Sequence, residues 1–400
     1  MKMLGKRKAD RTPSTPALDQ GALKAHLDFF SERQDEMVST IRQMVEIESP
    51  SDNKAAVDRM GDHIGSRFSA IGGRVQFHRI ADFGNHVQAD FEGESGRKPV
   101  LLLGHIDTVY PLGTLESMTC KIDKGRLWGP GVLDMKSGIG LMLHAIEALR
   151  SSGGTLPRPV TVLLVSDEEI GSDSSRHITE DLAKKSEAVF VLEPSFGLDG
   201  AVKTARKGVG EYQIKVTGKA AHSGLDFEKG VNAVIELARQ IEKVSKFTDL
   251  KRGLTVNPGV ISGGTRVNVV PAEATVAVDL RISKLKDAAG IDRKFRSLRP
   301  FNKKCKLTVT GGLNRPPLER TKAVEDLYRK AASISRSLGH RLGEAAVGGG
   351  SDGNFTAGLG IPTLDGLGGV GEGAHATHES IVIETLPWRA ALLAGLITAL

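Results

Sequence analysis

One stretch constrains the fold of this chain more than any other, the segment LLLGHIDTVYP from Leu101 to Pro111. It begins as an apolar run and ends in two polar side chains, His105 and Asp107. Side chains two residues apart in an extended strand lie on the same face, so these two point the same way. Open α/β sheets place their sites at the carboxyl ends of buried strands. A histidine beside a carboxylate that orients its second ring nitrogen suits a metal ligand.

The same pattern recurs along the chain. The apolar run that begins at Pro159 ends in carboxylates, and the shorter run AVFVLEP ends in Glu193. Continuous apolar runs are typical of strands buried on both faces, and here they alternate with helical patterns. We therefore predict an α/β fold with a mostly parallel sheet sandwiched by helices. The polar residues that follow these strands or lie in glycine-rich loops are His105, Asp107, Asp134, Glu168, Glu169, Glu193 and His375.

Between residues 203 and 313 the pattern changes. In the segment AEATVAVDLRIS, apolar and polar residues alternate, which is typical of a sheet covered on one side only. The order of elements is β-α-β-β-α-β, a ferredoxin-like arrangement. We predict an inserted ferredoxin-like α+β domain over 203–313, within a main domain formed by 21–202 and 314–400. At the start of the main domain, the spacing of apolar residues predicts one helix over 22–48 and another over 54–71.

Composition argues against several classes of protein. The net charge is +6, and residues 1–20 hold five basic and two acidic side chains, which is +3 of it. The rest is only mildly basic, so we expect no nucleic-acid partner. Residues 1–20 predict a disordered basic tail without the apolar segment of a secretory signal, and no apolar run predicts a membrane span. Cys120 and Cys305 form no CxxC pair and fit a reducing compartment, so we expect a cytoplasmic protein.

The residue types in the polar set are those of a metal centre. Two histidines and several carboxylates without a thiolate match zinc, with cobalt or manganese also possible. The number of ligands suits two metal ions that share one carboxylate and are bridged by a water or hydroxide. Adjacent residues of an extended chain point in opposite directions, so of Glu168 and Glu169 one can bind metal while the other is a general base. The glycine-rich loops contain no GxxxxGKS/T phosphate-binding pattern.

A set of short motifs identifies a family resemblance. The stretches GHIDTVYP, WGPGVLDMKSG, SDEEIGS, VLEPS, GKAAHSG, GGGSDGNF and GAHATHE occur in this order. Together they resemble the motif set of the aminoacylase/glutamate carboxypeptidase family of di-zinc exopeptidases, over roughly residues 25–398. Within that family the chain looks most similar to the glutamate carboxypeptidases that cleave folates.

The resemblance implies roles for the residues of the metal centre. His105 and Glu193 resemble the ligands of one zinc ion, and Asp107 the acid that orients His105. Asp134 resembles the carboxylate that bridges the two ions, which is often followed by a cis peptide bond. Glu169 and His375 resemble the ligands of the second ion, and Glu168 the general base. His378 lies three residues after His375 and is the alternative ligand; we favour His375.

The resemblance also implies roles outside that centre. The inserted domain resembles a lid and dimerisation domain, so we expect a homodimer. His222 in GKAAHSG resembles a histidine that reaches across the dimer to polarise the scissile carbonyl, a donor placed to stabilise oxyanion charge. The residues that resemble substrate contacts are Asn268, Arg281, Arg315, Gly350 and Ser351. Among them, Arg315 resembles the group that binds the carboxylate of the released amino acid.

Together these roles imply a metal-dependent hydrolase of small peptides or N-acyl amino acids. In the implied mechanism a hydroxide bridging two zinc ions attacks an amide carbonyl, with Glu168 as general base. Glutamate at position 193 resembles the carboxypeptidases and deacylases of the family, whereas its aminopeptidases usually carry aspartate there. Our first hypothesis is a carboxypeptidase, and the alternative is an N-acyl amino acid deacylase of the acetylornithine deacetylase or succinyl-diaminopimelate desuccinylase type. A third hypothesis, a non-catalytic metal-binding scaffold, is disfavoured because all the expected ligands and Glu168 are present.

Overall fold

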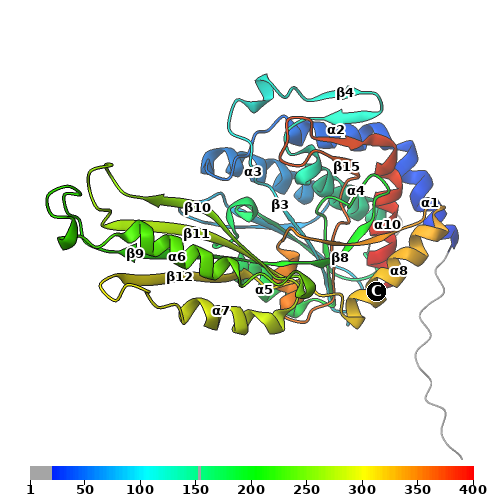
Figure 1. The fold of residues 1–400 in the computed structure, drawn as a ribbon. Coiled ribbons are helices and arrows are strands. Elements are labelled where there is room, and N and C mark those ends of the chain that lie inside the picture. The colour runs from blue at the N-terminus through cyan, green and yellow to red at the C-terminus, as the bar shows by residue number, and fades with distance from the viewer. Residues whose placement is uncertain (1–19, 152–154) are drawn as a thin grey trace, which may run out of the picture.

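A computed structural model describes residues 20–151 and 155–400, arranged around two sheets (Figure 1). The tail predicted over residues 1–20 lies outside the described residues, apart from Gln20. In the described part, no helix is both long enough and apolar enough to cross a membrane.

The first sheet has six strands in the order β1-β2-β6-β3-β7-β14. β3 runs parallel to β6 and β7, and β14 runs parallel to β7, whereas β1 and β2 form an antiparallel edge. The predicted mostly parallel sheet is therefore confirmed. The strands are β1 (Arg74–His78), β2 (His86–Phe91), β3 (Val100–His105), β6 (Val160–Val165), β7 (Ala188–Val191) and β14 (Thr363–Leu364).

Helices cover both faces of this sheet (Figure 1). Side chains alternate along β3, so Leu102 joins the larger core of helices α1–α4, α8 and α10, while Leu101 and Leu103 pack towards α5. Both faces of the strand are therefore apolar, because each packs against a layer of helices. The helices are α1 (Gln20–Glu32), α2 (Gln34–Val45), α3 (Lys54–Ala70), α4 (Ser137–Ser151), α5 (Arg176–Lys185), α8 (Lys322–Ser337), α9 (Gly353–Gly358) and α10 (Leu386–Ala399).

One helix prediction is wrong. Residues 22–48 do not form one helix but two, because the chain breaks at Arg33, whose backbone angles (φ −111°, ψ 18°) are not helical. Phe30 and Met37, which lie on either side of the break, are both buried in the core. Hydrophobic spacing alone does not detect it, since apolar residues continue at helical intervals on both sides. The second predicted helix, over 54–71, is confirmed as α3.

The second sheet has the predicted ferredoxin-like order. It consists of β9 (Gly208–Thr217), β10 (Thr255–Gly263), β11 (Glu273–Ile282) and β12 (Lys306–Arg315), in the spatial order β10-β11-β9-β12 with every pair antiparallel. Helices α6 (Ala233–Ser245) and α7 (Ala288–Arg296) pack on one face, and the whole unit extends away from the first sheet (Figure 1). The domain boundaries at 203 and 313 stay predictions; the strands themselves run from Gly208 to Arg315.

Short strands that periodicity did not predict complete the fold. β8 (Val202–Arg206) pairs in parallel with β13 (Glu344–Val347) and leads directly into β9. A small antiparallel sheet combines β15 (Gly371–Glu372), β16 (Ser380–Val382), β5 (Arg126–Trp128) and β4 (Lys121–Asp123). Strands of two to five residues are too short to give a recognisable alternation.

The closing helix, α10, carries a fully buried arginine, Arg389, whose hydrogen bonds go to backbone oxygens. Arg389 donates to the carbonyl oxygens of Gly366 (2.5 Å), Gly368 (2.9 Å) and Gly200 (2.9 Å), and no carboxylate of the described residues forms an ion pair with it. The amide of Gly368 in turn donates to the carbonyl oxygen of Glu193. Arg389 therefore anchors the loop that runs beside one of the predicted ligands.

We expect Arg389→Met to lower the free energy of unfolding by roughly 3 kcal/mol or more, because three buried carbonyls lose their donor. Arg389→Lys should lower the free energy of unfolding by less. The lysine ammonium group still donates hydrogen bonds, but it cannot reach all three carbonyls as the planar guanidinium does. Urea unfolding of the metal-free variants measures both. A methionine variant within 1 kcal/mol of the original protein, on the order of one ordinary hydrogen bond, would show that the anchor is unimportant.

Candidate active site

Adjacent parallel strands deliver the first site residues. His105 ends β3, Glu168 follows β6 and Glu193 follows β7, so the three lie at the same edge of the first sheet. The ring of His105 is buried, and its Nδ1 lies 2.9 Å from the backbone oxygen of Asp107 and 3.5 Å from Asp107 Oδ1. Because both neighbours of Nδ1 are acceptors, Nδ1 carries the hydrogen and the lone pair of Nε2 is free for a metal ion.

Two ligand clusters meet at Asp134. His105 Nε2 lies 3.1 Å from Asp134 Oδ1 and 3.5 Å from Glu193 Oε1. On the other side, His375 Nε2 lies 3.4 Å from Asp134 Oδ2 and 3.2 Å from Glu169 Oε1. In each cluster the candidate ligand atoms lie within 4.8 Å of one another. Each oxygen of Asp134 therefore faces a different cluster, as a bridging carboxylate requires.

The loop that carries Asp134 is held by a buried glutamate. Glu379 accepts hydrogen bonds from the backbone amides of Gly131 (2.9 Å), Leu133 (2.8 Å) and Asp134 (2.8 Å), and from the hydroxyl of Tyr110 (2.6 Å). The peptide bond after Asp134 is cis, as the resemblance implied. Glu379 thus fixes the backbone from which the shared carboxylate projects.

The two histidines near the carboxyl end differ in position. His375 belongs to the cluster with Asp134 and Glu169, whereas His378 is exposed and belongs to neither cluster of the described residues. His375 is itself half-exposed, with 50% of its side chain accessible, so this cluster opens to solvent.

Glu168 and Glu169 diverge, but not for the predicted reason. They lie in a 3-10 turn, Glu168–Ile170, rather than in extended chain, so the expectation of an extended backbone is wrong. The parallel strand ends at Val165, and the chain must turn there to reach α5. Glu169 contacts His375, while Glu168 Oε1 lies 3.0 Å from Arg315 Nη2. Their backbone amides both donate to the carboxylate of Asp107, at 3.3 and 3.2 Å.

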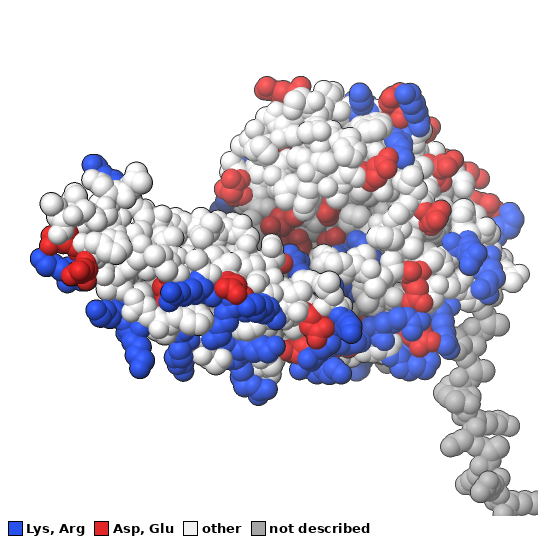
Figure 2. Space-filling view, in the orientation of Figure 1, with Lys and Arg blue, Asp and Glu red and all other residues white. Residues whose placement is uncertain are grey.

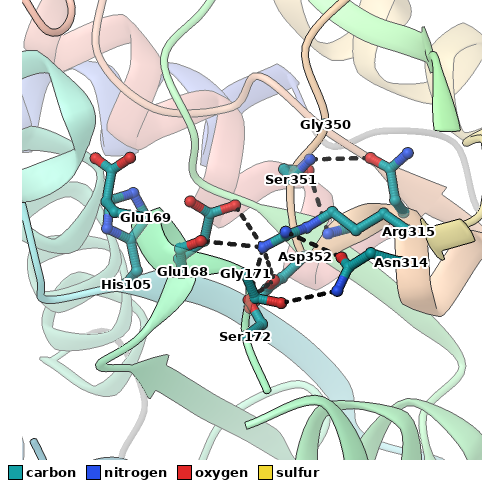
Figure 3. Close-up of polar contacts among 12 residues, drawn as sticks. His105, Glu168, Glu169, Gly171, Ser172, Asn314, Arg315, Gly350, Ser351 and Asp352 are labelled. Carbon is teal, nitrogen blue, oxygen red and sulfur yellow. Dashed lines mark hydrogen bonds and ion pairs between the residues drawn. The ribbon is translucent and has the colours of Figure 1, made fainter. Parts of the chain in front are cut away.

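Arg315 reaches this turn from the end of β12 (Figure 3). It is 7% exposed, and its Nη2 donates to Glu168, to Ser172 Oγ (2.6 Å) and to Asp352 Oδ1 (3.0 Å). Its Nε has no hydrogen-bond partner among the described residues, and Nη1 bonds only Asn314 Oδ1 at 3.3 Å. The guanidinium therefore already orients Glu168, and its Nε is a buried donor without a partner in the described part of the chain.

The glycine-rich loop predicted to assist Arg315 lies beside it. A Cβ on Gly350 would stand 2.9 Å from Val209 Cγ2 and 3.2 Å from Arg315 Cδ, so a larger residue would push these side chains away. Ser351 is buried, and its hydroxyl donates to Asp365 Oδ2 at 2.5 Å. Gly350 is thus brought to Arg315, while the side chain of Ser351 is committed to a different carboxylate.

The charges of the site favour cations. Acidic side chains gather in the hollow between the two parts of the molecule (Figure 2). Burial and the negative charge of Asp134 raise the pKa of Glu193 to about 7, and burial also raises the pKa of Glu168 well above its usual range. Hydrogen bonds to Asp134 and Glu169 raise the pKa of His375 to about 10. Buried carboxylates repel one another unless a cation compensates them, so the donor set fits two metal ions.

Two of the predicted residues lie far from this centre. The backbone amide of Ser223 donates to the backbone oxygen of Asn268 at 3.0 Å, which brings the exposed residues His222 and Asn268 together. β9 begins two residues after Arg206, which contacts Glu193, and its ten residues carry the chain roughly 30 Å away before His222 is reached. The loop after β9 lies at the end of the second sheet that is remote from the first (Figure 1).

Arg281 lies at the opposite end of β11 from Asn268. It is opposite Val209 in the sheet, near the first residues of β9, and its guanidinium pairs with Asp279 at 2.9 Å. The structure therefore separates the two substrate contacts predicted from the second sheet. Within one chain, neither His222 nor Asn268 can reach the clusters around Asp134.

Several site residues were not predicted from the sequence. Ser51 donates to Asp107 Oδ2 at 2.7 Å, and the buried pair Arg206–Asp365 lies against Glu193. The role of Glu379 as an acceptor for three backbone amides was also not foreseen. No local signal marks these residues, because each acts on a partner at least 13 positions away in the chain.

The fold and the site define a hydrolase of the metallopeptidase class. A model of the peptidase family M20/M25/M40 matches residues 101–399, and the chain belongs to this family. Carboxypeptidase G2 of Pseudomonas sp. strain RS-16 is 29% identical over 92% of this chain and 90% of that protein. Acetylornithine deacetylase of Myxococcus xanthus is 28% identical over 55% of this chain and 60% of that protein. The crystal structure of the aminopeptidase PepT of Bacillus cereus superimposes with a TM-score of 0.77 at 21% identity, covering 92% of this chain and 98% of that one.

Proposed function

We propose that the protein is a metal-dependent carboxypeptidase that hydrolyses the amide bond before a C-terminal amino acid, glutamate in the first instance. The observation that carries the proposal is the position of Asp134, shared by two ligand clusters, with Glu168 beside them. The similarity to carboxypeptidase G2 extends over nearly the whole chain and supports the same activity.

Each metal ion would have three protein ligands. His105, Asp134 and Glu193 would hold the first ion, and Asp134, Glu169 and His375 the second. Zinc suits this set of nitrogen and oxygen donors, and cobalt or manganese could replace it. When bound, the ions would polarise the scissile carbonyl and lower the pKa of the attacking water.

Glu168 is the general base in this proposal. It is not a member of either ligand cluster, and its carboxylate is held by Arg315. It accepts a proton from the attacking water and returns it to the nitrogen of the leaving amine. Asp107 keeps His105 in the tautomer that presents Nε2, and it fixes the turn that carries Glu168.

Arg315 binds the carboxylate of the C-terminal amino acid, and its Nε and Nη1 are the nitrogens not committed to Glu168. Gly350 lets the loop pack closely against Arg315, and Ser351 holds the loop in place through Asp365. A guanidinium that binds a carboxylate with two parallel hydrogen bonds favours substrates with a free terminus over amides. Arg281 contributes a further substrate contact from the same chain, whereas Asn268, which lies beside His222, contributes one from a second copy of the chain.

His222 acts from a second copy of the chain. The amides of Gly224 and Leu225 donate to its Nδ1 at 3.1 and 3.2 Å, so its Nε2 carries the hydrogen and can donate to a developing oxyanion. The nearby side chains of Leu225 and Val267 are 80% and 105% exposed, as an uncovered interface would be. We propose a homodimer through the second sheet, which acts as a lid.

We place the enzyme in the cytoplasm. Its two cysteines, Cys120 and Cys305, are free and buried, and reduced thiols fit that compartment.

The similarity to acetylornithine deacetylase supports a second candidate, an N-acyl amino acid deacylase with the same metal chemistry. A panel of substrates separates the two. We expect the zinc-loaded protein to release glutamate from N-benzoyl-glutamate and N-blocked dipeptides faster than it deacylates N-acetylornithine. The reverse preference would favour the deacylase, and no turnover on any of them would contradict both.

A further inference from the structure

A second arginine, Arg206, lies against the metal centre. It ends β8, it is 5% exposed, and its Nη2 lies 3.4 Å from Glu193 Oε2. The other oxygen of Glu193 faces His105 Nε2 at 3.5 Å. The carboxylate of Glu193 is thus placed between a candidate metal position and a guanidinium.

Arg206 is itself fixed by a buried carboxylate. Its Nε donates to Asp365 Oδ2 at 2.7 Å and its Nη2 to Asp365 Oδ1 at 2.8 Å, which is the bidentate geometry of a strong ion pair. Asp365 is fully buried and also accepts the hydroxyl hydrogen of Ser351. Two anchored groups therefore determine where the guanidinium can point.

The third nitrogen of Arg206 holds the loop near Arg315. Nη1 donates to the carbonyl oxygens of Gly350 (2.9 Å) and Gly349 (3.3 Å). Each nitrogen of Arg206 therefore has a partner, in contrast to Arg315, whose Nε has none among the described residues. An arginine with no available nitrogen is suited to holding other groups, not to binding substrate.

We propose that Arg206 is a positioning residue that holds Glu193 in the orientation needed for the first metal ion, and that Asp365 fixes Arg206 for this purpose. The inference rests on the proposed two-metal function. A carboxylate bound to a metal ion through one oxygen rotates freely unless its second oxygen is hydrogen-bonded. Arg206 supplies that hydrogen bond and also ties the 349–350 loop to the same ligand.

Metal binding tests this role without reference to activity. The metal-free protein is titrated with Co²⁺, following the visible absorption of the bound ion, against a competing chelator. We expect two ions per chain in the original protein. Arg206→Lys keeps the positive charge but loses the planar guanidinium and its paired hydrogen bonds. In this variant we expect the affinity for one Co²⁺ ion to fall by about 10- to 100-fold, while the affinity for the other stays within about twofold.

Arg320 offers a matched control. It forms the same bidentate pair with Glu344, at 2.7 and 3.0 Å, and contacts no candidate metal ligand. Arg320→Lys should therefore leave both Co²⁺ affinities unchanged. A double variant, Arg206→Lys with Glu193→Gln, should bind Co²⁺ no more weakly than Glu193→Gln alone, because both changes act on one ligand.

Asp365→Asn provides a second route if Arg206→Lys does not fold. It keeps the shape of the side chain and removes the charge that fixes Arg206, so the same single affinity should fall. Unchanged affinities in the folded variants, or an equal fall of both affinities, would overturn the proposal. Fewer than two ions in the original protein would instead contradict the proposed function, so the two failures are distinguishable.

Discussion

Glu168→Gln is expected to lower kcat by about 10²- to 10⁴-fold, because the reaction loses its general base and acid. Glutamine has nearly the same shape and can still accept a hydrogen bond from Arg315, so the fold around the turn should persist. Because Glu168 belongs to neither ligand cluster, both metal ions should stay bound. Steady-state hydrolysis of N-benzoyl-glutamate and metal analysis of the same sample measure the two quantities.

The adjacent residue provides the control. Glu169 contacts His375 in the second cluster, so Glu169→Gln should lose or weaken one metal ion. The two neighbouring substitutions are thus expected to have different effects: Glu168→Gln lowers kcat, and Glu169→Gln lowers the metal content. Loss of metal from Glu168→Gln, or near-normal kcat with both ions bound, would contradict the assignment of Glu168.

His222→Ala is expected to lower kcat by about 10²- to 10³-fold, the usual effect of removing one donor to an oxyanion. The side chain is exposed and lies beyond the ten residues of β9, so the variant should keep its stability and its metal ions. The loss should appear mainly in kcat, because the donor acts on charge that develops in the transition state.

A mixing experiment tests whether His222 acts across a dimer. His222→Ala and Glu168→Gln are each nearly inactive, but a mixed dimer contains one site with Glu168 from one chain and His222 from the other. After subunit exchange, about half of the dimers are mixed and half of their sites are intact, so roughly a quarter of the original activity should return. If the mixture stays inactive although chains exchange, His222 does not act in trans.

The sequence predicted the parts of the site that follow strands. His105, Glu168 and Glu193 come directly after apolar runs, and parallel strands bring such positions to one edge of a sheet. The alternation in β11 likewise predicted a sheet covered on one face, and α6 and α7 cover it. These features depend on local patterns, which one sequence contains.

Contacts between distant segments could not be predicted in the same way. Arg206 and Asp365 are 159 positions apart, and Glu379 accepts from the Asp134 amide across 245 positions. In the sequence, a charged residue that is buried beside a partner looks the same as one that is exposed on the surface, because the partner comes from a distant segment. The break at Arg33 is a similar case, because tertiary packing ends the first helix where no proline or glycine marks an end.

The most direct test of a metal-dependent hydrolase at this site is the turnover of N-benzoyl-glutamate before and after removal of metal. Chelation should abolish glutamate release, and two equivalents of Zn²⁺ per chain should restore it, because Asp134 joins two ligand clusters. Undiminished turnover by the metal-free protein would contradict the account.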